Sequence, residues 1–144
     1  MATYVKYYDF ADQLVRGVHD FDAHTFKIAL SNTAGDIALT KTMLSEITQI
    51  SATNGYTTGG TATSLTMSEA TGTMTVQGTQ VVFTANTGTM ATFQYYILYN
   101  DSATSPSKAL IAGWDHGSTV SLADGESFTI KFNNATPGTI FTLG

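Results

Sequence analysis

The sequence predicts a mainly β fold, a β-sandwich or jelly-roll-like domain that carries one N-terminal amphipathic helix. Threonine, whose branched side chain suits a pleated surface, occurs 26 times, and 13 glycines provide material for turns. Charged residues make up only 12% of the chain, about half the usual share. From residue 62 onward, segments rich in β-branched and aromatic residues recur at the spacing of about 8–12 residues that is typical of a sandwich.

The length of 144 residues is that of one domain, and we expect residues 1–144 to form one, with a helix or arm at 1–20 and the sandwich at 25–144. The helix is predicted over residues 4–18, with Thr3 as its N-cap. Because about four helical turns are marginal on their own, the helix has to pack on the sheet or on a neighbouring subunit. Its apolar side chains recur every three or four positions and are Tyr7, Phe10, Ala11, Leu14, Val15 and Val18.

The rest of the chain is expected to alternate strands and turns. Residues 25–31 have the alternation of a half-buried strand, Asn32 to Asp36 is a turn cluster, and residues 38–50 are compatible with a short helix. Tight hairpins are predicted at Gln77-Gly78 and at Asp124-Gly125, the second as a type I′ turn. The later strands are predicted at 62–67, 72–77, 79–85, 91–99, 108–114, 118–122, 126–133 and 139–143, with both prolines in loops.

The strand at residues 91–99 is expected at the centre of the sheet. Alternation places Phe93, Tyr95, Ile97 and Tyr99 on one face and Gln94, Tyr96 and Leu98 on the other. Apolar side chains on both faces predict a strand that is covered on both sides, in a sandwich centre or at a subunit contact. The alternative interpretation of these aromatic residues is a sugar-stacking face.

Composition excludes several classes of function. The net charge is −5 and the six basic residues are scattered singly, so nucleic acid is not an expected partner. Without cysteine there is no disulfide, no thiol catalysis and no cysteine-based zinc site. The N-terminus does not resemble a signal peptide and no apolar run reaches membrane-spanning length, so synthesis in a cytoplasm and no membrane partner are expected.

No group of residues predicts catalysis, a cofactor or a bound metal, and the chain is not expected to be an enzyme. The cluster His19, Asp20, Asp22 and His24 matches neither zinc nor EF-hand spacing and is interpreted as a solvated connector. The segment from Trp114 to Gly117 is interpreted as a core tryptophan that runs into a polar turn.

Two further segments have simple structural interpretations. Asp124 and Glu126 flank the glycine of a turn, which explains both carboxylates without a glycosidase site. The glycine-rich loop of residues 55–60 lacks the Gly-Lys-Ser/Thr ending of a phosphate-binding loop.

An amphipathic N-terminal helix and the six segments that follow it together resemble a family of small virion proteins of tailed bacteriophages, similar to capsid decoration (cement) proteins. The resemblance covers nearly the whole chain through these six segments. They are Thr-Phe-Lys-Ile-Ala-Leu-Ser-Asn (25–32), Leu-Ser-Glu-Ile-Thr-Gln-Ile (44–50), Asn-Gly-Tyr-Thr-Thr-Gly-Gly (54–60), Val-Val-Phe-Thr-Ala (81–85), Tyr-Tyr-Ile-Leu-Tyr-Asn-Asp (95–101) and Leu-Ala-Asp-Gly-Glu-Ser-Phe-Thr-Ile (122–130). The resemblance implies a sandwich or jelly roll, made in the host bacterial cytoplasm, that forms homotrimers on the outer surface of the virion head. It also implies binding to the major capsid protein and stabilisation of the capsid by bridging of its subunits.

The N-terminal segment is the candidate contact region of such a protein. We expect the helix or the segment before it, Met1 to Tyr8, to touch the capsid or another subunit, with Tyr4, Val5, Tyr7, Tyr8 and Phe10 as contact residues. The alternative function is a tail- or fibre-associated glycan-binding β module that uses exposed aromatics among residues 93–99 or Trp114.

Overall fold

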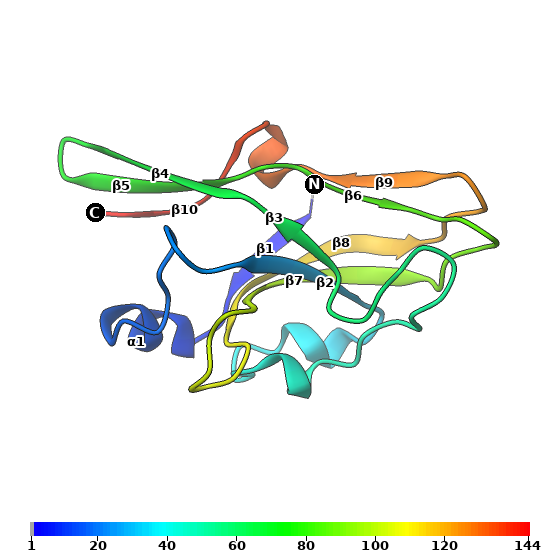
Figure 1. Cartoon of the computed structure of the whole chain (residues 1–144), viewed down its shortest axis with the longest axis horizontal. Coiled ribbons are helices and arrows are strands. Elements are labelled where there is room, and N and C mark those ends of the chain that lie inside the picture. The colour runs from blue at the N-terminus through cyan, green and yellow to red at the C-terminus, as the bar shows by residue number, and fades with distance from the viewer. Residues whose placement is uncertain (1) are drawn as a thin grey trace.

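The computed structural model describes residues 2–144 and confirms a mainly β protein with one α-helix (Figure 1). Met1, which belongs to the predicted contact segment, lies outside the described residues. The elements are β1 (Thr3–Lys6), α1 (Asp9–Val15), β2 (Phe26–Ser31), η1 (Ala34–Ile37), η2 (Leu44–Glu46), β3 (Thr61–Thr63), β4 (Leu65–Ala70), β5 (Thr73–Gly78), β6 (Val81–Thr84), β7 (Phe93–Asn100), β8 (Leu110–Val120), β9 (Ser127–Ile130), η3 (Phe132–Asn134) and β10 (Gly138–Leu143), where η marks a 3₁₀ helix.

A five-stranded antiparallel sheet forms the centre of the molecule, in the order β1-β8-β7-β2-β3. A second layer lies along one face of it and consists of the pair β6-β9 and the three-stranded sheet β10-β5-β4 (Figure 1). We call β4, β5 and β10 the wing, because this sheet extends past the end of the central sheet. The arrangement is sandwich-like.

The opposite face of the central sheet is covered by the chain between β2 and β3, which carries η1 and η2 (Figure 1). Strand β7 is therefore covered on both sides, as its apolar pattern predicts. Phe93, Tyr96 and Leu98 belong to the core beneath the second layer. Tyr95, Ile97 and Tyr99 pack under the η1–η2 segment, where Leu44 and Ile47 meet them.

The predicted face of Phe93 is wrong. Alternation placed Phe93 with Tyr95, but the pairing with β8 is irregular between these two residues, so Phe93 turns to the other face. Such a bulge changes which face a side chain occupies, and no feature of the alternating pattern announces it.

The predicted helix over residues 4–18 is wrong in its first half. Residues Thr3–Lys6 form β1, which pairs with β8, and α1 covers only Asp9–Val15 with Tyr8, not Thr3, at its N-cap. Strand pairing supplies hydrogen bonds to the edge of β8 that outweigh a weak helix propensity. Thr3–Lys6, from the expected arm at 1–20, therefore belongs to the central sheet.

The predicted apolar stripe of the helix is also wrong at three positions, the first of which is Ala11, an exposed residue. Val15 is 89% exposed, whereas Gln13 is buried and bonded to His19. The helix ends at Val15, and Gly17 follows shortly after it with a φ of +79°, a conformation that favours glycine.

Both predicted hairpins are wrong. Strands β5 and β6 lie in different sheets, and so do β8 and β9. At Asp124-Gly125 only the glycine has a positive φ, +86°, whereas a type I′ turn requires two such residues. That requirement is met by Thr71 (φ +50°) and Gly72 (φ +85°), which join β4 to β5.

Two strand boundaries also differ from the prediction. The segments 108–114 and 118–122 form the single strand β8, which includes Trp114 and Asp115. The predicted strand 62–67 is divided at Ser64, where the chain passes from the central sheet to the wing. The Ser64 N–H donates to the Thr79 hydroxyl, 3.0 Å away, and Ser64 accepts from the Thr79 N–H, so both backbone groups stay bonded at the crossing.

Candidate functional site

A cavity of about 540 Å³ lies where the second layer separates from the edge of the central sheet. Its volume falls within the range of small-molecule sites, roughly 300–1,000 Å³. The lining comes from β1 and β8 on one side and from β9, η3 and β10 on the other. The lining residues are Ala2, Tyr4, Tyr96, Trp114, His116, Phe128, Thr129, Ile130, Lys131, Phe132, Asn133, Asn134, Thr139, Ile140, Phe141 and Thr142.

Strand register builds an aromatic row along this cavity. Tyr4 on β1 and Tyr96 on β7 are both register partners of Trp114 on β8, so the three side chains lie side by side on one face. The Trp114 ring lies 5.6 Å from the Tyr96 ring at an interplanar angle of 18°, and 5.6 Å from the Tyr4 ring at 60°. Tyr4 is 39% exposed and Trp114 only 8%, so the outer end of the row is the accessible one.

Burial keeps the tyrosine hydroxyls of the row protonated. It raises the pKa of Tyr96 to about 12, with the carboxylate of Asp115 adding to the effect. Burial also raises the pKa of Tyr4. Both hydroxyls are therefore hydrogen-bond donors as well as acceptors at neutral pH.

The rim of the cavity is polar and carries no carboxylate. Its hydroxyl and amide groups come from threonines and asparagines, and its basic groups from His116 and Lys131. The backbone of Asn133 (φ +50°) and Asn134 (φ +55°) turns through the left-handed region that asparagine tolerates better than most residues. The chain as a whole has a net charge of −5, whereas this lining contains no Asp or Glu.

The five predicted contact residues lie in two different environments. Tyr4 and Tyr8 are exposed at 39% and 64%, and Val5 is half-buried. Tyr7 and Phe10 are buried in the protein's own core, where the Tyr7 hydroxyl donates to the carbonyl of Asp36 and Phe10 packs on Phe141. Of the five predicted contact residues, Tyr4 and Tyr8 are thus the exposed ones.

The wing carries a second exposed apolar surface, which the sequence analysis did not single out. Register places Met67, Val76 and Phe141 in one cross-strand row and Glu69, Met74 and Leu143 in the next. Val76 and Phe141 pack toward the core, but toward the tip Met67 is 38% exposed and Leu143 is 58% exposed. This apolar surface belongs to a sheet whose two outer strands, β4 and β10, have no further strand beside them among residues 2–144.

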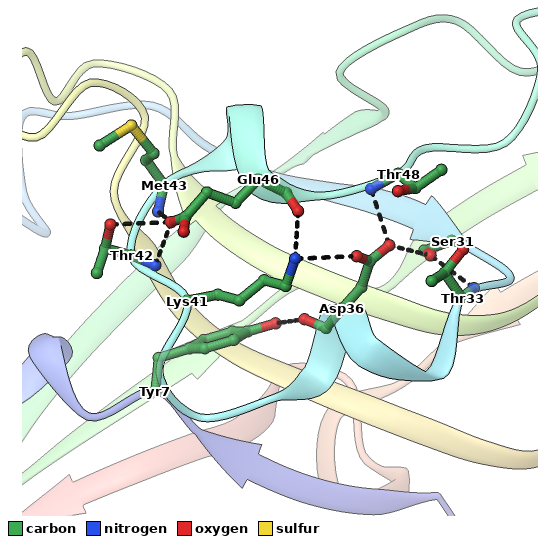
Figure 2. Close-up of polar contacts among 9 residues, drawn as sticks. All are labelled: Tyr7, Ser31, Thr33, Asp36, Lys41, Thr42, Met43, Glu46 and Thr48. Atoms are coloured by element: carbon green, nitrogen blue, oxygen red, sulfur yellow. Dashed lines mark hydrogen bonds and ion pairs between the residues drawn. The ribbon is translucent and has the colours of Figure 1, made fainter.

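A buried carboxylate, Asp36, lies under the opposite face of the central sheet, within the segment predicted as a turn cluster. Its side chain is 1% exposed and accepts from the Ser31 hydroxyl at 2.5 Å and the Thr48 N–H at 2.8 Å, and Lys41 pairs with it at 3.6 Å (Figure 2). Tyr7 donates to the backbone carbonyl of the same residue at 2.7 Å.

Glu46 completes this polar network. Its carboxylate accepts from the N–H groups of Thr42 and Met43, and these bonds lower its pKa (Figure 2). Lys41 donates to the Glu46 carbonyl at 2.5 Å. Each charged group of the network has partners within the chain, so the network fastens the η1–η2 segment to the sheet and leaves no group free to react with a substrate.

The histidine–aspartate cluster is the predicted solvated connector only in part, because Asp20 and Asp22 are exposed whereas His19 is buried at 6% exposure. The Asn100 amide nitrogen lies 3.1 Å from Nδ1 of His19 and 2.9 Å from Nδ1 of His24, and donates to both. Nε2 of His19 lies 3.0 Å from the Gln13 amide oxygen and donates to it. Both imidazoles are therefore engaged in holding the connector against β7, and within residues 2–144 no group of three His, Asp or Glu residues is arranged to hold a metal ion.

The other candidate motifs have structural roles. Asp115 accepts from the Gln94 amide at 2.9 Å and from the Gly117 N–H at 2.8 Å, and these bonds lower its pKa. Glu126 accepts from the Ala123 N–H and closes the turn that leads into β9. In the glycine-rich loop, Tyr56 is buried and its hydroxyl donates to Gln49 at 2.6 Å, so this loop is packed onto the body.

The described helix is too short to cross a membrane, and none of the 3₁₀ segments in residues 2–144 is longer. Comparison with known proteins adds no relative: no family model, no curated protein and no solved structure matches the chain.

Proposed function

We propose that this chain is a non-enzymatic structural protein of a tailed-bacteriophage virion, a capsid decoration protein that binds the outer head surface. The resemblance of six segments to such proteins motivates the proposal, and the wing is the structural observation that carries it. A sheet that extends beyond the body with an apolar surface and unpaired outer strands is suited to contact another protein chain.

The partner surfaces in this proposal are the major capsid protein and other copies of the chain, as a homotrimer. Burial of apolar surface contributes about 25 cal/mol per Å², so the side chains near the wing tip favour association only when they are covered. A stable contact covers roughly 800 Å² on each partner. In a virion, many copies act together, so modest contacts at each copy suffice to hold capsid subunits in place.

The exposed tyrosines of the N-terminal segment provide a second contact region. Tyr4 and Tyr8 are large amphipathic side chains of the type that is enriched at protein interfaces. The scarcity of charge fits dense packing of copies, because close copies of a highly charged protein would repel one another.

A matched pair of variants tests the proposal. The double variant Met67→Glu/Leu143→Glu places two charges on the wing surface, whereas Val82→Glu places one on the exposed apolar residue of β6 as a control. Light scattering after size exclusion measures the oligomeric state, and co-sedimentation with heads built from the same phage's major capsid protein measures binding.

The wild-type chain and Val82→Glu should form trimers and sediment with heads, whereas the double variant should lose one or both properties while remaining folded. A wild-type chain that stays monomeric and does not bind heads would contradict the proposal.

The second candidate function is a glycan-binding β module associated with the tail or a fibre. The observation that favours it is the cavity lined by Tyr4, Trp114 and Tyr96. Antibody labelling of intact particles separates the two functions, because a decoration protein covers the head whereas a tail or fibre module labels the tail alone.

A further inference from the structure

We infer that the cavity between the aromatic row Tyr4–Trp114–Tyr96 and the segment from β9 to β10 is a saccharide-binding site, with a preference for a sugar that carries a carboxylate. The inference deepens the second candidate function, the glycan-binding module. The biological role of the site rests on that function. Saccharide binding itself does not depend on whether the protein lies on the head or on the tail.

The two sides of the cavity match the two kinds of surface on a sugar. A pyranose ring has an apolar face of C–H groups and a perimeter of hydroxyls. Tyr4, at 39% exposure, supplies a ring that the C–H face can stack on, and the buried rings of Trp114 and Tyr96 pack behind it. The rim supplies neutral residues with hydrogen-bond donors and acceptors, among them Thr129, Asn133 and Asn134, that can bond to hydroxyls.

Other ligand classes fit the lining less well. A lipid chain favours an apolar enclosure, whereas the rim of this cavity is polar on the β9–β10 side. A phosphate or nucleotide is usually held by clustered basic groups or glycine-rich backbone, and here Lys131 is the sole lysine or arginine of the lining. The lining thus combines aromatic residues with uncharged polar residues, and this combination suits a carbohydrate better than a lipid or a phosphate.

Charge sets the expected preference among sugars. No Asp or Glu lines the cavity, although acidic residues outnumber basic ones by 11 to 6 in the whole chain. The Asp115 carboxylate lies near enough to act on Tyr96 and His116, so the favourable position for an anionic substituent is the part of the lining beside Lys131. An acidic sugar therefore gains an interaction that a neutral sugar lacks, and this gain weakens as salt is added.

The protein carries its own reporter for the site, because Trp114 is the sole tryptophan of the chain and lines the cavity. Titration with N-acetylglucosamine oligomers and with glucuronic-acid oligomers should change the Trp114 emission in a saturable way. We expect dissociation constants on the order of 1 mM, with the acidic oligomer binding more tightly at low salt.

Two variants with one control locate the binding. Tyr4→Ala removes the accessible ring and should weaken both sugars roughly fivefold, in line with the worth of one aromatic contact. Tyr8→Ala removes a tyrosine that is even more exposed but lies outside the cavity, and should leave both dissociation constants unchanged. Lys131→Gln should abolish the preference for the acidic oligomer and keep the binding of the neutral one.

The outcome separates this inference from the proposed decoration function. The wing variant Met67→Glu/Leu143→Glu should retain the full fluorescence response even where it no longer binds heads. The inference is overturned if neither oligomer changes the Trp114 emission at about 10 mM, a tenfold excess over the expected constant. It is equally overturned if Tyr8→Ala weakens binding as much as Tyr4→Ala, or if a peptide of this chain's own sequence changes the emission and the sugars do not.

Discussion

The two faces of the central sheet are covered in different ways. Under one face, the η1–η2 segment is fastened by the polar network around Asp36, in which each charged group has partners (Figure 2). Over the other face, the second layer consists of two separate pieces, and a cavity lined by Tyr4, Trp114 and Phe128 lies at its margin. The comparison teaches that a buried polar network closes one face, whereas the other face keeps a cavity at its margin, with Tyr4 as its exposed aromatic residue.

The largest expected effect comes from the closed face. Asp36→Ala leaves the Ser31 hydroxyl, the Thr48 N–H and the Lys41 ammonium without their buried partner. We expect a loss of about 3–5 kcal/mol in the free energy of unfolding, measured by urea denaturation.

Asp124→Ala, at an exposed turn residue, serves as the control and should change the free energy of unfolding by less than about 0.5 kcal/mol. An Asp36→Ala protein as stable as the wild type would show that the network does not fasten this face.

A smaller effect is expected from pH. It arises where the Asn100 amide donates to Nδ1 of both His19 and His24. Burial lowers the pKa of His19 to about 4, and the charge of His24 adds to this. The unfolded chain takes up the proton near pH 6.5, so unfolding is favoured progressively as the pH falls from about 6.5 to 4. Next to these residues, the Asp20 backbone N–H donates to Nδ1 of His24, and the Asp20 carboxylate accepts from the N–H groups of Asp22 and Ala23.

Stability should therefore be full above pH 6.5 and decrease by roughly 2–3 kcal/mol by pH 4. Urea denaturation at several pH values measures the slope. His19→Gln should flatten it in this window, whereas His116→Gln, at the cavity rim, should leave it unchanged. A slope that survives in His19→Gln would assign the effect to other groups.

The smallest effect compares one hydroxyl on each face. Tyr7→Phe removes the 2.7 Å bond to the Asp36 carbonyl and should cost about 1 kcal/mol. Tyr96→Phe removes a hydroxyl on the cavity side, with no hydrogen-bond partner inside residues 2–144, and should cost less than about 0.5 kcal/mol. Thermal unfolding of the two variants side by side measures the difference, and equal losses would mean that the two faces are closed to the same degree.

Local patterns predicted the parts of the fold that depend on neighbouring residues in the chain. The strand at β2 and the two apolar faces of β7 follow directly from residue types and agree with the structure, but β2 is buried on both faces instead of half-buried, with Ala29 at 0% exposure. The strand at Thr3–Lys6 could not be predicted in this way, because it exists through its pairing with β8, more than a hundred residues away. The turn at Thr71-Gly72 was overlooked because threonine is an uncommon first residue of a type I′ turn.

The candidate site was predictable only in fragments. Trp114 and the aromatics of β7 were recognised as possible sugar contacts, but nothing in the sequence shows that register aligns Tyr4, Trp114 and Tyr96 in one row. The burial of Asp36 was equally invisible, because its partners at Ser31, Lys41 and Thr48 come together only when the segment folds back on the sheet.

A reconstruction of the intact phage particle tests the central claim most directly. The account predicts density for this fold in regular trimers on the outer surface of the head, with the wing surface around Met67 and Leu143 covered by a neighbouring chain. A head surface without this fold, with the protein confined to the tail or absent from the particle, would contradict the proposed decoration function.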